Sequence, residues 1–169
     1  MPHSTPETTV TRGSEPRWLS PDELAAWRTF SRMMAKLQGE LEAHLQRTAC
    51  LSYVEYHALA MLSERADHTL RMSELADLTN ASLSRLSHLV KRLELRGLVR
   101  REPDPDNGRF TNAILTEQGY ATLVAAAPAH VTKVRELVID AVSPAQLRQF
   151  AAGAERIIDR IDRSAGGCP

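Results

Sequence analysis

The chain has 169 residues, of which 43% are hydrophobic and 25% are charged, and its formal net charge at pH 7 is zero. This composition excludes disorder over the whole length, and the zero net charge excludes a uniformly polybasic protein. No uncharged stretch is long enough to span a bilayer, so the sequence predicts one soluble domain with a substantial core and no membrane partner.

The chain begins with a polar arm followed by a long helix. Residues 1–16 are rich in Pro, Ser and Thr without apolar periodicity, which predicts a disordered arm. Within segment 17–50, Ser20 is followed by a proline and, three positions on, by Glu23, a pattern that starts a helix running to about Arg47. Its apolar stripe is long enough to predict half of a dimer interface. The stripe consists of Trp27, Phe30, Met34, Leu37, Leu41 and Leu45.

Residues 51–115 predict a helix-turn-helix. A second Ser-x-x-Glu pattern at Ser52 starts a helix to about Glu64. Residues 72–79 form a second, short helix, and Asn80 and Ala81 form the tight connection to a third. The first of these helices is expected to bury Val54, Ala58, Met61 and Leu62.

The third helix, within residues 80–97, carries its cations on the face that cannot be core. Ser82 is its expected N-cap and Gly97 its C-cap. Between Arg85 and Arg101 six cations stand against one anion, a local charge of +5 that suits a phosphate backbone. Taken alone, a solvated face is the equal alternative. The predicted stripe of buried residues is Leu86, Leu89, Val90 and Leu93, and the predicted DNA contacts are Ser82, Ser84, Arg85, Ser87, His88, Lys91 and Arg92.

A β-hairpin is predicted directly after this helix. Residues 98–102 and 110–115 have the composition of two strands, and the loop 103–109 between them contains an Asn-Gly turn signal. Such a hairpin is a wing that puts Arg109 at or near its tip, where the adjacent minor groove is the expected target. Asp104 or Asp106 is expected to hold the Arg109 side chain, and a solvated arginine on a mobile loop is the alternative.

The remaining segment, residues 116–163, predicts helices that complete a dimer interface. Thr116 caps the first, in which Pro128 is expected to cause a kink or a break. Ser143 caps the last, whose apolar face needs a partner. Residues 164–169 are expected to form a flexible tail. The fold class is therefore mostly α with a small β-hairpin wing: a winged helix-turn-helix lobe with long dimerisation helices from both termini.

From Trp18 to Arg163 the sequence resembles the multiple-antibiotic-resistance regulator (MarR) family of winged-helix transcription factors. The family usually has Asp-x-Arg at the wing tip, whereas this chain has one residue more between Asp106 and Arg109. Arg109 still matches the wing arginine of the family. The motifs that carry the resemblance are SELADL at 73–78, LVKRLELRGLVRRE at 89–102, PDPDNGRFTNAILTEQGY at 103–120 and PAHVTKVRELVIDAVSPAQ at 128–146.

The resemblance implies a cytoplasmic homodimer that binds double-stranded DNA at a near-palindromic operator, acts as a repressor and responds to a small aromatic or phenolic ligand. Effectors of the family often bind between the dimerisation helices and the DNA-binding lobe. The side chains that could line such a site are Trp27, Phe30, His44, Tyr53 and His57. Ordinary core packing is the alternative for each of them.

Two other function classes fit the sequence less well. A winged-helix protein-interaction adaptor would not need the +5 segment or Arg109. An enzyme would need a phosphate loop, a nucleophile motif or paired carboxylates, and none is present, so no catalytic residue, cofactor or metal site is expected. With two cysteines the chain has no disulfide framework, and Cys50 is expected to be a small apolar residue rather than an oxidant sensor.

Overall fold

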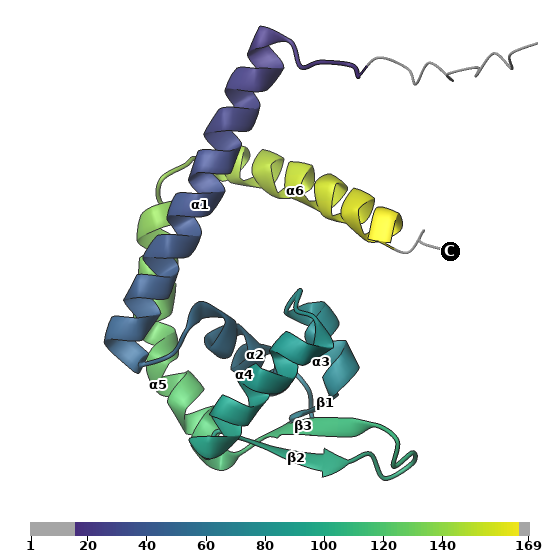
Figure 1. Ribbon diagram of the computed structural model, residues 1–169. Helices are drawn as coiled ribbons and strands as arrows, with labels where there is room; N and C mark the ends of the chain where they lie inside the picture. Colours follow the sequence, from purple (N-terminus) through teal and green to yellow (C-terminus); the bar gives the residue numbers. More distant parts are fainter. Residues whose placement is uncertain (1–15, 166–169) are drawn as a thin grey trace, which may run out of the picture. The chain divides into compact units, whose positions relative to one another are not determined.

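The computed structural model describes residues 16–165 (Figure 1), so the predicted arm up to residue 15, residues 166–169 of the predicted tail, and Cys168 lie outside the described residues. The chain divides into two units at a boundary within the first helix, after Ala35. No helix in the described range is both long and apolar enough to cross a membrane. The elements are α1 (Pro21–Ala49), α2 (Tyr53–Ser63), β1 (Thr69–Arg71), α3 (Met72–Leu78), α4 (Leu83–Leu95), β2 (Val99–Pro103), β3 (Thr111–Leu115), α5 (Glu117–Val134), the π-helical turn η1 (Arg135–Ile139) and α6 (Pro144–Ala165).

The predicted helix starts are confirmed by their hydrogen bonds. At the start of α2, the Glu55 backbone N–H donates to Ser52 Oγ at 3.1 Å, while the Ser52 N–H donates to the Glu55 carboxylate at 2.9 Å. The same reciprocal pair forms at Ser20 and at Ser143, and Thr116 caps α5 through the Gly119 N–H. Each cap satisfies backbone donors that the first helical turn leaves without a partner.

The hydrophobic core lies in the second unit, where α2, α3 and α4 pack against a small sheet (Figure 1). The predicted stripe of α4 is buried in full. In α2 the prediction was partly wrong, because Val54 and Met61 are only half-buried, whereas Leu59 and Glu55 are buried. The buried Glu55 was not expected from its residue type, and its ion pairs, described below, account for it.

The sheet has three antiparallel strands in the order β1-β3-β2. The two strands of the predicted wing form, each one residue later at its start than expected, with Arg100 opposite Ile114. Strand β1 was not predicted, because three residues are too few to show a period-two pattern. Its pairing puts Leu70 opposite Ala113 and brings Arg71, the last residue of β1, to the outer half of β3.

The break considered at Pro128 does not occur, since α5 continues through it to Val134 and only then passes into the π-helical turn. A proline cannot donate to the carbonyl four residues earlier, that of Val124. Both residues are exposed, so water can reach that carbonyl and the helix persists. Helix α6 ends at Ala165, and its last two residues were expected to lie in the tail.

Candidate nucleic-acid interface

Turns and caps fix both ends of helix α4, and one face of the helix remains exposed to solvent. Before it, Asn80 adopts a left-handed conformation (φ 49°) that turns the chain from α3, and Ser82 Oγ accepts from the Arg85 N–H at 3.3 Å. After it, Gly97 has φ 70°, which a residue with a Cβ rarely adopts, and ends the helix as predicted. The predicted DNA-contact residues of α4 are all exposed. The helix therefore presents an exposed face that is polar between Leu83 and Leu95, which are exposed at its two ends.

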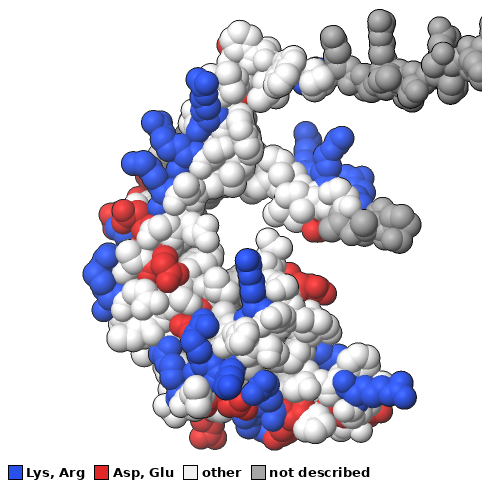
Figure 2. Space-filling view, in the orientation of Figure 1, with Lys and Arg blue, Asp and Glu red and all other residues white. Residues whose placement is uncertain are grey.

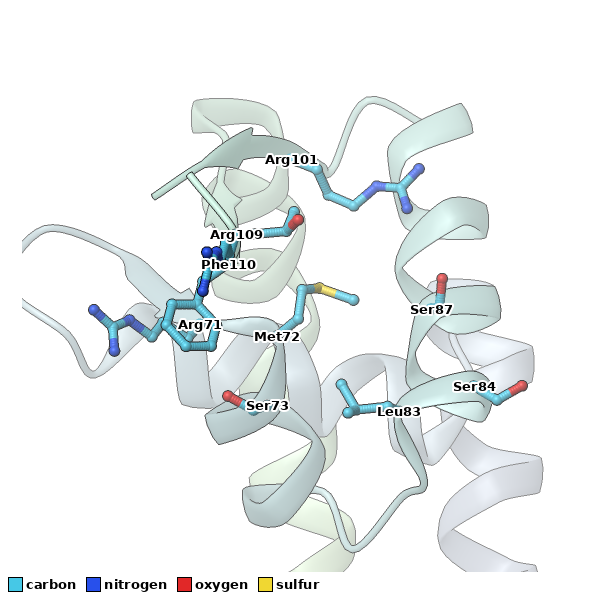
Figure 3. A pocket seen from close by; sticks show the side chains of 10 residues that line it. Arg71, Met72, Ser73, Leu83, Ser84, Ser87, Arg101, Arg109 and Phe110 are labelled. Atoms are coloured by element: carbon cyan, nitrogen blue, oxygen red, sulfur yellow. The ribbon is translucent and has the colours of Figure 1, made fainter. Parts of the chain in front are cut away.

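A groove of about 510 Å³ separates the N-terminal half of α4 from the wing. Figure 3 shows Arg71, Arg109 and Phe110 on one side of it, and Ser84 and Ser87, which α4 carries, on the other. The structure thus brings together three of the predicted DNA-contact residues, Ser84, Ser87 and Arg109. The remaining lining residues are Met72, Ser73, Leu83, Arg101 and Thr111.

Ion pairs with Glu55 and Glu102, which lie outside residues 85–101, compensate two of the five net positive charges predicted for that segment, and Glu94 within it pairs with Arg101. Arg101 donates to Glu94 at 2.6 Å, and Arg100 pairs with Glu102. Figure 2 accordingly shows acidic and basic side chains mixed over the lower part of the molecule, where the strands lie. Within residues 16–165, the two cations of this segment that form no ion pair are Arg85 and Lys91.

Arg92, a predicted DNA contact, has an exposed side chain that also pairs with a residue of α2. Its Nε donates to the Glu55 carboxylate at 3.3 Å, and Arg96 approaches the same group at 3.6 Å. Glu55 is buried, and a buried carboxylate needs such partners to offset its lost hydration. The sequence could not show this, because the two residues are 37 positions apart. Arg92 fixes α4 to α2.

The wing turn differs from the predicted Asn-Gly turn. Gly108 does not have a positive φ, so Asn107 and Gly108 are not the central residues of a primed hairpin turn. Asn107 is instead the first residue of the turn. Its carbonyl accepts from the Phe110 N–H at 2.9 Å, and its side-chain oxygen accepts from the Arg109 N–H at 3.2 Å. Asn is favoured at this position because its side chain caps the turn. Arg109 is exposed within it.

The expectation that Asp104 or Asp106 holds the Arg109 side chain was wrong. Asp104 accepts from Arg71 Nε at 2.8 Å, and the side chain of Arg109 forms no ion pair or hydrogen bond within residues 16–165. The Arg71 guanidinium also lies 5.0 Å from the centre of the Phe110 ring, which is cation–π distance. Sequence reasoning missed Arg71 because it lies on the strand that was not predicted.

Two carboxyl groups beside this groove are held ionised by arginines. The hydrogen bond from Arg71 lowers the pKa of Asp104, and the N–H groups of Asn107 and Asp106 add to the effect against the opposing effect of burial. The hydrogen bond from Arg101 likewise lowers the pKa of Glu94. Both pairs join a strand or loop of the hairpin to another element, so the groove has a fixed frame at neutral pH.

The five predicted effector-binding residues fall into separate groups. Trp27 and Phe30, 6.3 Å apart by ring centroids, belong to the first unit. In the second unit Tyr53 stacks on His57, with centroids 6.2 Å apart and planes 4° apart. His44 donates to the Ala129 carbonyl at 3.1 Å and lines a shallow hollow of about 400 Å³.

A further histidine, which the predicted set omitted, lies between these groups of the second unit. His130 of α5 packs on Tyr56, with centroids 4.4 Å apart, and lies 6.5 Å from Tyr53. Burial, followed by the charge of His44, lowers the pKa of His130, while burial raises that of Tyr56. His130 Nδ1 is buried and has no hydrogen-bond partner within the described part of the chain. This cluster of aromatic rings therefore contains one buried polar atom, His130 Nδ1, that is unpaired among the described residues.

Comparisons with known proteins agree with this architecture. Residues 51–109 match the model of the MarR family, whereas no curated protein matches the chain. The structure is similar to Sco3205, a MarR family transcriptional regulator from Streptomyces coelicolor solved in complex with DNA, with 38% identity and a TM-score of 0.83 over 85% of this chain and 94% of that one. AbsC, a MarR family transcriptional regulator from the same organism, gives the same identity and TM-score over 87% and 99%. The regulator BldR from Sulfolobus solfataricus is 25% identical, with a TM-score of 0.72 over 82% and 96%.

Proposed function

The chain belongs to the MarR family of transcriptional regulators, and from that premise we propose that it is a homodimeric, sequence-specific repressor whose DNA affinity responds to a small aromatic ligand. The observation that carries the proposal is the groove between α4 and the wing, with the polar face of α4 on one side and arginines on the other. A similar protein of 38% identity was solved in complex with DNA, which supports DNA binding by this chain.

In this proposal α4 enters the major groove. Its N-terminal half exposes short polar side chains, which allow close approach to base edges, and Ser84, Arg85 and His88 discriminate between bases. Lys91, which is exposed and unpaired among residues 16–165, holds a phosphate. Ser82 presents the helix N-terminus, because its side chain already caps α4. Arg92 is withdrawn from this set, since Glu55 holds it.

The wing reaches the adjacent minor groove. A two-stranded hairpin is too thin to fill a major groove, and Arg109 stands in its terminal turn with a free side chain among the described residues. An arginine there responds to the enhanced negative potential of narrow A·T-rich tracts. The wing therefore adds a preference for groove width to the base readout by α4.

The dimer is formed by α1, α5 and α6. Among residues 144–164 of helix α6 none is buried, yet the apolar side chains of the helix fall on one face. Four large apolar side chains of this face are each about half exposed: Phe150, Ile157, Ile158 and Ile161. A monomer rarely exposes so much apolar surface in one patch to water. A second copy of the chain covers this face and sets two α4 helices about 34 Å apart on one side of the duplex.

The ligand binds beside Tyr53, His57 and His130. A flat aromatic molecule can stack on these rings, and a hydroxyl or carboxylate on it can bond the unpaired His130 Nδ1. Addition of 4-hydroxybenzoate and related phenolic acids to the protein–DNA complex tests this, with fluorescence anisotropy as the readout. Release of DNA by none of them removes the aromatic ligand from the proposal and leaves DNA binding intact.

The experiment that tests the proposal is selection of bound duplexes from a random pool by the full chain. We expect enrichment of two inverted half-sites about 10 base pairs apart, centre to centre, because the symmetry of a dimer is repeated in its site. A pool without enrichment, together with weak binding even at low salt, would indicate the other candidate, a protein-interaction adaptor. The observation that keeps this alternative open is that four of the six cations of residues 85–101 already have carboxylate partners within the described chain.

A further inference from the structure

We infer that Arg71, Asp104 and Phe110 form a brace that positions the wing arginine, Arg109, relative to α4. The inference rests on the proposed function, because Arg109 has a target only if the chain binds DNA. Arg71 is the last residue of β1 and directly precedes Met72, the first residue of α3. A contact to Arg71 is therefore a contact to the helix-turn-helix itself. We call these three residues the wing brace.

The wing brace fixes both ends of the wing loop with one guanidinium. Arg71 Nε donates to Asp104 Oδ2 at 2.8 Å, at the start of the loop. The same guanidinium lies 5.0 Å from the ring centre of Phe110, at the end of the loop. The two ends are also joined directly, because the Asp104 N–H donates to the Phe110 carbonyl at 3.0 Å. Arg71 thereby ties the closed loop to β1.

The second oxygen of Asp104 organises the inside of the loop. Oδ1 accepts from the backbone N–H groups of Asp106 at 3.0 Å and Asn107 at 3.1 Å. The side chain of Asn107 in turn accepts from the Arg109 N–H at 3.2 Å. A continuous series of hydrogen bonds thus runs from Arg71 to the backbone of Arg109. The buried member is Asp104, whose two oxygens would lose their partners if the loop changed its geometry, so its carboxylate favours one arrangement of the loop.

Because Asp104 is negatively charged, the direction of the affinity change on neutralising it shows whether it positions Arg109. A carboxylate beside a DNA-facing groove repels phosphate, so neutralising it should strengthen binding if electrostatics alone matters. Only 6% of Asp104 is exposed, and its two carboxylate oxygens are taken up by Arg71 and by the loop backbone. If the carboxylate holds Arg109 in place, Asp104→Asn weakens binding despite the more favourable net charge. The two roles predict opposite changes in affinity.

The test is a double-mutant cycle on a selected operator, followed by fluorescence anisotropy. Asp104→Asn should weaken binding about tenfold in the otherwise unaltered chain, because the wing arginine loses its fixed place. In the Arg109→Ala background the same change should alter affinity less than about twofold, since there is no arginine left to position. The preference for A·T-rich over G·C-rich flanks should fall with Asp104→Asn as it does with Arg109→Ala.

Glu102→Gln is the matched control. Glu102 also lies in the wing and also pairs with an arginine, Arg100, but it accepts no hydrogen bond from the loop backbone. Its neutralisation should leave binding unchanged or strengthen it. Arg71→Gln serves as the second variant, because it removes the tie to β1 and leaves the Asp104 bonds within the loop. Melting curves show whether each variant is folded.

The pattern of affinity losses decides the inference. Non-additive losses, with Arg71→Gln repeating the pattern of Asp104→Asn, support it. Equal losses in both backgrounds, or tighter binding by Asp104→Asn, overturn it while DNA binding by the unaltered chain stands. If Asp104→Asn does not fold, the cycle is read from Arg71→Gln alone, and equal losses there overturn the inference. An unaltered chain that binds no duplex contradicts the proposed function itself.

Discussion

At the scale of single residues, whether a lysine or arginine has a carboxylate partner decides its role more than its position on the helix does. Lys91 and Arg92 are neighbours on α4, but Arg92 is bound to the buried Glu55 and Lys91 has no ion-pair partner among the described residues. Lys91→Ala should lower the slope of log K against log salt by about one phosphate and leave stability unchanged. Arg92→Ala should keep the slope and cost about 1 kcal/mol of unfolding free energy, because a bond to a buried charge is lost. Anisotropy over a salt series and urea unfolding measure the two quantities, and a lowered slope for Arg92→Ala would restore it to the DNA-contact set.

The buried imidazole of His130 should make the stability of the fold depend on pH. Burial and the charge of His44 lower the pKa of His130 in the folded chain, so the unfolded chain binds the proton more tightly. The folded chain therefore favours neutral His130. The free energy of unfolding falls as the pH drops below the ordinary histidine pKa of about 6.5, because the unfolded chain then takes up the proton first. His130→Phe keeps a ring against Tyr56 and removes the titration. The loss of urea midpoint between about pH 7.5 and about pH 5.5 should be smaller for His130→Phe than for the unaltered chain. Equal losses would contradict the assignment.

At the scale of elements, the join between α4, β2 and α5 depends on one glycine. A Cβ added to Gly119 would lie 2.0 Å from the backbone carbonyl oxygen of Leu98, which cannot move aside as a flexible side chain can. Gly119→Ala should therefore cost about 2–4 kcal/mol of unfolding free energy. Gly39→Ala is the control, since nothing lies within 4 Å of the added atom in α1 and alanine favours the helix. Denaturant unfolding compares the two variants; a similar small effect at both sites would show that the join is loose.

The helices could be predicted from sequence because their signals are local. The Ser-x-x-Glu pattern at Ser52 and the four-residue stripe of α4 act within one or two helical turns, and both are confirmed. The winged helix-turn-helix order followed from these signals together with the two wing strands. Chain continuity through Pro128 was not predictable, because it depends on solvent access to that turn of α5.

The candidate site was predictable only in part, because its decisive contacts join residues far apart in the chain. Exposure of the predicted α4 residues follows from helical period, and it is confirmed. The Arg71–Asp104 pair spans 33 positions and the Arg92–Glu55 pair spans 37, and no local pattern marks either. Strand β1, only three residues long, is what brings Arg71 to the wing.

At the scale of the whole molecule, the account requires two copies of the chain. Ile157→Asp with Ile161→Asp places two charges on the exposed apolar face of α6 and should give folded monomers, because an interface cannot bury unpaired carboxylates. Sedimentation measures the state, and the variant should bind a full operator no better than a single half-site. A folded monomer of the unaltered chain at micromolar concentration would show that α6 is not the interface.

The central claim is that α4 reads base sequence, and the ratio of affinities for the selected operator and a scrambled duplex tests it most directly. Each good base contact is worth about 1–3 kcal/mol against a wrong base, so replacing Ser84, Arg85 and His88 together by alanine should bring the ratio close to one. Binding to the scrambled duplex should persist more weakly, through Lys91 and the wing. A triple variant that keeps the ratio of the unaltered chain, measured by fluorescence anisotropy at one salt concentration, would contradict the account.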